Sequence, residues 1–351
     1  MLKITDLQKQ YTAGSVAVSH FNLDVNDGEI VALLGNEGSG KTTVLKLIAG
    51  ATPKSGGTVL LDGNTPEMKD MIMVFDDLAL NKGKTLRKNL EFSLNKRNTR
   101  KDVVSTRVAA AAEFLKLTHR LDYKVKELTE FEKRKGALAR LLVRDDYKLV
   151  LVDDICGKLG TSERRTLWNY ALRILSNLSV SVIFSTTEHS EAYSLADRVV
   201  ALDHSEVKQI GAPDAIIAAP ANVSAAKLTD GRYNIISAIL IENGGLALKI
   251  DQAILSIKDL APRLCSRDYI GEKVLVGFTA DATAPFEKGV KVRVLYEEKA
   301  PGGRYLHCIY DEGAIQVFDK NNEITDGEYS FLPWRDKICL FDFENENCIL
   351  I

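Results

Sequence analysis

The stretch Gly35-Asn36-Glu37-Gly38-Ser39-Gly40-Lys41-Thr42-Thr43 decides the fold. It fits the pattern G-x-x-x-x-G-K-[ST] and lies between an apolar run at 30–34 and a helical pattern at 44–49. Glycines let backbone N–H groups approach an anion, and the N-terminus of a helix offers further N–H groups to phosphate. Lys41 can reach the β- and γ-phosphates of a nucleotide, and the Thr42 hydroxyl can ligate Mg²⁺. The alternative is a glycine-rich turn that matches by chance. We expect a nucleotide site formed by Asn36, Gly38, Ser39, Gly40, Lys41, Thr42 and Thr43.

The composition is that of an ordinary globular protein. The 351 residues are 45% hydrophobic with a net charge of −2, which gives no electrostatic argument for binding nucleic acid or an anionic membrane. No apolar run approaches the ~18–20 residues that a membrane-spanning helix needs, and the first residues show no signal peptide. Five dispersed cysteines without a C-x-x-C pair are typical of reduced thiols in the cytoplasm.

Strand and helix patterns alternate over residues 1–210. Residues 2–9 and 16–25 alternate polar and apolar, as antiparallel strands do. Residues 149–152 are wholly apolar, which is typical of a strand buried on both faces of a parallel sheet. Further strands are expected at 30–34, 58–61, 71–75, 180–185 and 198–202, and helices over 86–143, 161–178 and 188–196. We predict an α/β fold around a parallel sheet, with an antiparallel part at its front.

The pattern changes after residue 219. From about residue 235, short strand patterns are separated by turn signals at 243–245, 301–303, 321–322 and 326–327. Such spacing is typical of a small all-β module of barrel or OB type. We expect a first domain at 1–219 with a helical subdomain at about 77–145, a linker at 220–234, and a β-rich domain at 235–351.

Several motifs, spread over nearly the whole chain, resemble the ATP-binding subunits of ATP-binding-cassette (ABC) importers. The most similar group is the sugar importers that carry a C-terminal β regulatory (TOBE) domain. Besides the glycine loop, the resemblance is carried by Ala137-Leu138-Ala139-Arg140, Leu195-Ala196-Asp197-Arg198, Gln209-Ile210-Gly211-Ala212-Pro213, Pro220-Ala221-Asn222 and Phe341-Asp342. It implies an α/β P-loop NTPase domain with a helical subdomain, an OB/TOBE-like domain after it, and ATP and Mg²⁺ as ligands. It also puts Tyr11 where the family stacks an aromatic ring on adenine; the alternative is a half-buried tyrosine of a strand or turn.

The carboxylates expected from the resemblance are partly changed. Asp153 keeps the family's Mg²⁺-organising aspartate. The next residue, normally a glutamate that polarises the attacking water, is Asp154. Aspartate is shorter by roughly 1.5 Å, and a misplacement of ~1 Å can cost about 10²-fold in rate. The glutamine that touches Mg²⁺ and the membrane partner is replaced by Asp76, whose carboxylate can still ligate the metal.

The histidine that contacts the γ-phosphate in this family falls on Thr187, a short neutral hydroxyl. His189 follows two residues later, and alternate residues of an extended segment share a face. His189 is therefore either a replacement contact or a solvated residue at the start of a helix.

The signature loop shows the largest departure. The family's L-S-G-G-Q aligns with Leu128-Thr129-Glu130-Phe131-Glu132, and in the family this loop closes over the γ-phosphate of ATP held by the opposite subunit. Thr129 keeps a hydroxyl, but Glu130 and Phe131 put side chains where glycines admit backbone N–H groups. A carboxylate ~4 Å from a phosphate charge repels it by about 4 kcal/mol at an effective dielectric of ~20. The alternative is an ordinary helix start, because Thr129 and Glu132 have the spacing of a capping box.

Two subunits of this family meet head to tail, and each ATP lies between one glycine loop and the other signature loop. Because this chain departs at both sets of positions, we expect little hydrolysis by a homodimer. The resemblance implies a degenerate half that binds ATP, pairs with a competent paralogue, and docks on integral membrane permease subunits for a sugar or similar solute. Such a subunit lies peripherally at the cytoplasmic face of the cell membrane. Two alternatives stay open: a non-hydrolysing ATP-responsive regulator or scaffold of the permease, and an ordinary importer ATPase that tolerates the substitutions.

Overall fold

The computed structural model describes residues 1–11, 14–75, 78–95, 100–229, 232–311, 313–320 and 327–350. The chain divides into two compact units, Met1–Val207 and Lys208–Ile351, and each is described by itself. The expected domain limits at 219 and 235 stay a prediction. Two of the expected turns, at 321–322 and at residue 326, lie outside the described residues.

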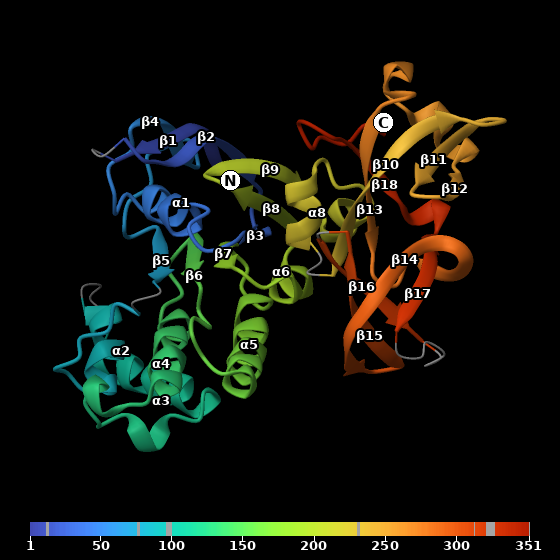
Figure 1. Cartoon of the computed structure of the whole chain (residues 1–351). Coiled ribbons are helices and arrows are strands. Elements are labelled where there is room, and N and C mark those ends of the chain that lie inside the picture. Colours follow the sequence, from blue (N-terminus) through green and yellow to red (C-terminus); the bar gives the residue numbers. More distant parts are fainter. Residues whose placement is uncertain are drawn as a thin grey trace. The chain divides into compact units, whose positions relative to one another are not determined.

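A six-stranded sheet forms the centre of the first unit (Figure 1). Its buried strands are parallel where they pair, as the apolar run at 149–152 predicted. β3 comes first of these strands in the chain but lies between β7 and β8 in the sheet. Ligands of open α/β sheets bind outside the carboxyl ends of the strands, at points where the connections diverge. In order across the sheet the strands are β5 (Met71–Val74), β6 (Leu149–Asp153), β7 (Ser181–Thr186), β3 (Ile30–Leu34), β8 (Arg198–Asp203) and β9 (Glu206–Gly211).

A second, antiparallel sheet of three strands belongs to the same unit. It consists of β2 (Val16–Val25), β1 (Leu2–Gln10) and β4 (Gly56–Leu61) in that order. Its apolar face shares one core with helix α1 (Lys41–Ile48) and the parallel sheet, with Leu2, Phe21 and Leu45 fully buried. The antiparallel front part predicted from residues 2–9 and 16–25 is therefore confirmed. This core holds α1, and with it the glycine loop, in place.

In the chain segment that connects β5 to β6, three α-helices pack against one another (Figure 1). They are α2 (Leu86–Asn95), α3 (Lys101–Phe114) and α4 (Glu130–Val143). The helical pattern predicted over 86–143 is interrupted at 115–129, where Lys116 has a positive φ and two short 3-10 turns follow. The remaining helices of the unit are α5 (Thr161–Leu175) and α6 (His189–Leu195).

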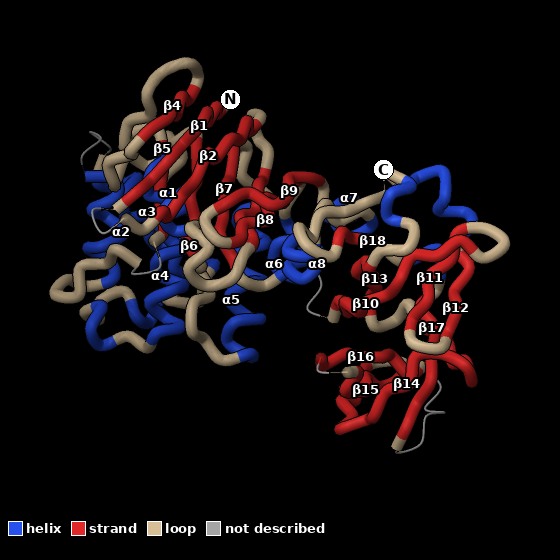
Figure 2. Tube along the Cα trace, turned by 45° about the horizontal axis from the view of Figure 1, so that its top comes forward, coloured by secondary structure: helices blue, strands red, loops and turns tan. Residues whose placement is uncertain are grey.

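The second unit is rich in strands (Figure 2), as the short strand patterns predicted. These strands pair antiparallel. Phe278 and Phe331 lie in its core, with ring centroids 5.8 Å apart. This region is consistent with an OB-like domain. Two helices precede it, α7 (Pro213–Ala218) and α8 (Val223–Thr229). One sheet has the order β12 (Ala253–Ser256), β11 (Leu246–Ile250), β10 (Tyr233–Glu242), β13 (Lys273–Thr279), β18 (Cys339–Asp342); the other has β16 (Gly313–Asp319), β15 (Gly303–Tyr310), β14 (Thr283–Ala300), β17 (Glu328–Pro333).

None of the helices in the described ranges combines the length and the apolar character needed to cross a membrane.

Candidate nucleotide-binding site

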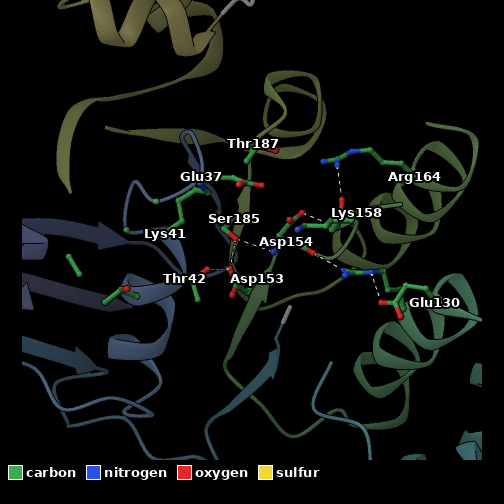
Figure 3. Close-up of a pocket in the computed structure, with 16 residues that line it drawn as sticks. Glu37, Lys41, Thr42, Glu130, Asp153, Asp154, Lys158, Arg164, Ser185 and Thr187 are labelled. Carbon is green, nitrogen blue, oxygen red and sulfur yellow. Dashed lines mark hydrogen bonds and ion pairs between the residues drawn. The ribbon is translucent and has the colours of Figure 1, made fainter. Parts of the chain in front are cut away.

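A cleft of about 770 Å³ opens at the carboxyl ends of β3, β6 and β7 (Figure 3). One wall is the glycine loop, which we call the phosphate loop (residues 35–43). The facing wall, which we call the helical wall, comes from the start of α4 and from residues 154–164. Sixteen residues line the cleft: Ala17, Glu37, Gly38, Gly40, Lys41, Thr42, Thr43, Glu130, Arg134, Asp153, Asp154, Gly157, Lys158, Arg164, Ser185 and Thr187.

The phosphate loop has the backbone shape that its sequence predicts. Gly40 has φ +101°, and a Cβ there would collide with the carbonyl oxygen of Ala17, so the loop needs glycine at this position. In the described part of the chain, no side chain caps the start of α1, which leaves its first N–H groups for a ligand. Lys41 Nζ donates to the carbonyls of Gly35 (2.7 Å) and Asn36 (2.7 Å) and contacts Ser39 Oγ at 3.3 Å.

Burial lowers the pKa of the Lys41 ammonium from its usual value, while Asp154, Asp153 and Glu37 oppose that shift by their charge. The lysine thus lies at a desolvated site, with three carboxylates whose charges favour its ammonium form. An anionic phosphate in the cleft would favour the charged form further.

Asp153 ends β6 and is almost completely buried. Its Oδ1 accepts from the Thr42 hydroxyl at 2.9 Å and from the Ser185 hydroxyl at 2.8 Å. Strand pairing explains the second contact, because Asp153 and Ser185 are register partners of β6 and β7. Mg²⁺ prefers oxygen ligands, and a hydroxyl next to a carboxylate supplies two of them. Thr42 and Asp153 therefore fit the metal that the ABC resemblance implies, and bound Mg²⁺ would neutralise phosphate charge there.

Asp154 is hydrogen-bonded to β7, to α4 and to its own loop. Its N–H donates to Ser185 Oγ (3.0 Å), its carbonyl accepts from Arg134 Nη1 (3.0 Å), and its Oδ1 accepts from the Gly157 N–H (3.1 Å). Its φ of +37° is unusual for a residue with a side chain. The carboxylate is therefore already bonded to the backbone three residues further on.

Arg134 joins helix α4 to this loop. The side chain is buried at 5% exposure, and Nη1 donates to the carbonyls of Asp154 and, at 2.8 Å, of Ile155. Its Nε pairs with Glu130 at 3.2 Å, one turn earlier on the helix. Gly157 has φ +46°, and a Cβ at this residue would collide with the Arg134 guanidinium. The arginine and the glycine therefore fit each other, and together they shape the loop that carries Asp154.

The signature segment forms a capped helix start, as the capping-box alternative predicted. Thr129 Oγ1 accepts from the Glu132 N–H at 3.2 Å, and Glu132 accepts from the Thr129 N–H at 3.0 Å. Glu132 also pairs with Arg120 at 2.8 Å. The Lys135 ammonium lies 5.1 Å from the Phe131 ring centroid. Glu130 lines the cleft of its own chain, where Lys133 and Arg134 offset its charge.

Thr187 lines the cleft beyond the end of β7, at the edge that faces Lys41 in Figure 3. Below it, Thr186 Oγ1 donates to Glu191 (2.6 Å), and Glu191 pairs with Arg164 through Nε (2.8 Å) and Nη2 (3.0 Å). Arg164 Nη1 also donates to the carbonyl of Gly157 at 3.3 Å. This network ties the start of α6 to the loop after β6.

Several predicted positions are not among the described lining residues: Asn36, Ser39, Thr129, Phe131 and Glu132, together with Tyr11 and His189. Tyr11 is 45% exposed, lies under the Lys9 ammonium at 4.9 Å, and is not among the described lining residues. His189 begins α6 and packs near Tyr193, with 6.1 Å between ring centroids, which agrees with the helix-start alternative. Asp76 lies outside the described residues.

Sequence reasoning missed four residues that shape the site: Ser185, Arg134, Lys158 and Arg164. Ser185 had a usable signal, a small polar residue near the end of a buried strand. Arg134 had a weaker one, its position one helical turn after Glu130.

Known proteins match this chain in sequence along most of its length. A family model described as ABC transporter matches residues 18–157. The ABC transporter ATP-binding protein YurJ of Bacillus subtilis is 28% identical over 99% of this chain and 99% of its own length. The spermidine/putrescine import ATP-binding protein PotA of Haemophilus influenzae is 30% identical over 76% of this chain and 70% of its own length. The sn-glycerol-3-phosphate import ATP-binding protein UgpC 3 of Rhizobium johnstonii is 35% identical over 63% and 65%, respectively.

Solved structures share the fold. The dimeric structure of MJ0796, a bacterial ABC transporter cassette, has a TM-score of 0.55 at 22% identity, covering 60% of this chain and 98% of that chain. The structure of cbiO1 from Clostridium perfringens, part of the ABC transporter complex cbiONQ, has a TM-score of 0.54 at 21% identity, covering 62% of this chain and 90% of that chain. With a phosphate loop, a buried aspartate and a capped signature helix around one cleft, this chain belongs to the ABC transporter family and has the α/β P-loop NTPase fold of its ATP-binding cassettes.

Proposed function

We propose that this chain is the ATP-binding subunit of an importer and that it binds ATP much better than it hydrolyses it. Binding is supported by the phosphate loop, whose lysine and threonine face the cleft together with Asp153. Weak hydrolysis is supported by one observation above all. One oxygen of the Asp154 carboxylate, at the position of the water-activating group, accepts from the Gly157 N–H, which holds the group towards its own loop. A general base must reach the proton that it removes.

The neighbouring positions support the same proposal. Thr187 presents a neutral hydroxyl where an imidazole would contact the terminal phosphate. The Thr129 hydroxyl, the group best suited to reach the nucleotide of a second subunit, is engaged by the cap of α4. Turnover in a complex would then depend on a partner subunit with intact hydrolytic residues, in a heterodimer docked on membrane permease subunits at the cytoplasmic face. If Asp76 also ligates Mg²⁺, the set of metal ligands would hold two carboxylates, Asp76 and Asp153, besides the Thr42 hydroxyl.

The proposed solute is a sugar or a related small polar molecule. Two relatives bear names that specify import, one of sn-glycerol-3-phosphate and one of spermidine and putrescine. These names concern those proteins, and they support import as the direction of transport for this chain. The C-terminal unit supplies the β-rich domain that we propose as the OB/TOBE-like regulatory part.

The test is to measure ATP binding and ATP turnover of the purified chain, first alone and then with a candidate partner and permease. We expect saturable MgATP binding, little turnover alone, and a gain in turnover in the complex. Robust turnover by the chain alone would support an ordinary importer ATPase and overturn the proposal. Binding without any gain in the complex would support a non-hydrolysing regulatory or scaffold subunit instead.

A further inference from the structure

Three cationic side chains of the helical wall line the cleft: Arg134, Lys158 and Arg164. Figure 3 shows Lys158 and Arg164 across the cleft from Lys41 of the phosphate loop. Three carboxylates line the cleft close to them or to Lys41: Glu37, Asp153 and Asp154; Glu130 adds a fourth at the start of α4. A bound triphosphate brings several negative charges into this space. Its terminal phosphate therefore needs cations in addition to Lys41.

Two of the three cations on the helical wall are committed to other groups. Arg134 donates to the carbonyls of Asp154 and Ile155 and pairs with Glu130. Arg164 pairs through two nitrogens with Glu191. Neither can turn to a ligand without leaving a buried or half-buried carboxylate or carbonyl unpaired, which is costly.

Lys158 differs from both arginines. Its side chain is exposed at the cleft, and within the described residues it has no hydrogen-bond or ion-pair partner. It lies on the short loop between Gly157 and Gly160, one residue beyond the Arg134–Gly157 contact that fixes this loop. A lysine is a flexible point charge that suits phosphate. Its position is therefore set by the loop, while its ammonium remains available.

We infer that Lys158 contacts the terminal phosphate of bound nucleotide and makes the cleft prefer ATP over ADP. This inference rests on the proposed function, since it requires that the cleft binds ATP. The ammonium supplies at the helical wall a charge that the neutral Thr187 lacks. ADP has no third phosphate, so this contact adds little to its affinity. Lys158 therefore raises the affinity for ATP relative to that for ADP.

The experiment measures the dissociation constants of MgATP and MgADP by calorimetry for the full chain and for Lys158→Gln. We expect the variant to bind MgATP about 10-fold more weakly, the effect of one lost charge contact, and to bind MgADP within about 2-fold of the original. Lys158→Arg should keep most of the preference. Lys54→Gln, at an exposed lysine away from the cleft, is the matched control and should change neither constant.

The outcomes separate the inference from the proposed function. If the unmodified chain binds neither nucleotide, both fall. If it binds ATP and Lys158→Gln changes neither constant, the inference alone is overturned. An equal loss of ATP and ADP affinity would also overturn it, because a general change of the loop would weaken both ligands alike.

Discussion

The two walls of the cleft differ in what their polar groups are bonded to. On the phosphate loop, Lys41 and Thr42 contact groups next to the space that a nucleotide would fill. On the helical wall, the Asp154 carbonyl accepts from Arg134 of α4, and the Asp154 carboxylate accepts from the Gly157 N–H. We propose that nucleotide binding depends mainly on the phosphate loop and hydrolysis on the helical wall. One can therefore be retained while the other is lost, and each prediction below tests one wall against the other.

The largest effect is expected on the phosphate loop. Lys41→Ala should weaken MgATP binding by about 100-fold, since a charge-assisted contact of about 1.5–3 kcal/mol is removed. Equilibrium binding of a fluorescent ATP analogue measures this loss. Lys46→Ala, in the last turn of the same helix, is the control and should bind normally. Unchanged binding by Lys41→Ala would contradict the assignment of this loop to phosphate.

The next effect is expected on the helical wall, and it concerns stability. Gly157→Ala should lower the free energy of unfolding by about 2–4 kcal/mol, because it combines a left-handed backbone with overpacking against Arg134. Urea denaturation measures the change. Gly83→Ala, in an exposed turn without such a contact, should stay within about 0.5 kcal/mol.

The contact between Arg134 and Gly157 can be tested separately with a double-mutant cycle. Arg134→Ala removes the guanidinium that the new Cβ would meet, so the two changes together should cost about 1–2 kcal/mol less than the sum of the single changes. Additive costs would show that the two residues do not shape the loop together.

The phosphate-loop wall could be predicted from sequence because its information is local. The glycines, Lys41 and Thr42 lie within nine residues, and the strand and helix on either side follow from apolar runs. The carboxylate Asp153 could be placed as well, since it stands at the end of a wholly apolar run, where β6 ends. Parallel pairing then brings these groups together without any further information.

The helical wall could be predicted only in part. The capping box of Thr129 and Glu132 follows from a spacing of three residues, and it was found. The contacts of Arg134 with Asp154 and Ile155 join residues twenty or more positions apart and depend on the positive φ of Gly157. No local pattern encodes such a contact, so the shape that Arg134 gives to this loop could not be foreseen.

A smaller effect is expected from the cap of α4. Thr129→Ala should lower the free energy of unfolding by about 1 kcal/mol, as removal of an N-cap hydroxyl does. MgATP binding by the chain alone should stay within about 2-fold, because the hydroxyl serves the helix. Thr166→Ala, at an exposed threonine inside α5, is the matched control and should change stability by less than about 0.5 kcal/mol. A marked loss of ATP affinity in Thr129→Ala would instead assign Thr129 to the nucleotide.

The smallest effect is expected at Asp154, where the same substitution in an ordinary ATPase would lower ATP turnover strongly. Asp154→Asn keeps an oxygen that can accept from the Gly157 N–H, so the loop should hold its shape. If the carboxylate serves the loop and not the water, the variant should keep ATP turnover within about 3-fold in the chain alone and in the partner complex. Loss of a working general base typically costs about 10²–10⁴-fold. Steady-state phosphate release measures the difference.

Asp153→Asn is the counterpart of this variant at the carboxylate that contacts the phosphate loop through Thr42. Asp153 accepts from two hydroxyls and is the carboxylate that fits Mg²⁺, so its change should weaken MgATP binding while Asp154→Asn leaves binding intact. A fall in turnover of about 100-fold or more in Asp154→Asn, with normal binding, would mean that Asp154 leaves the Gly157 N–H when ATP is bound and acts on water. The two walls would then work as one catalytic site, and the separation of binding from hydrolysis would no longer hold.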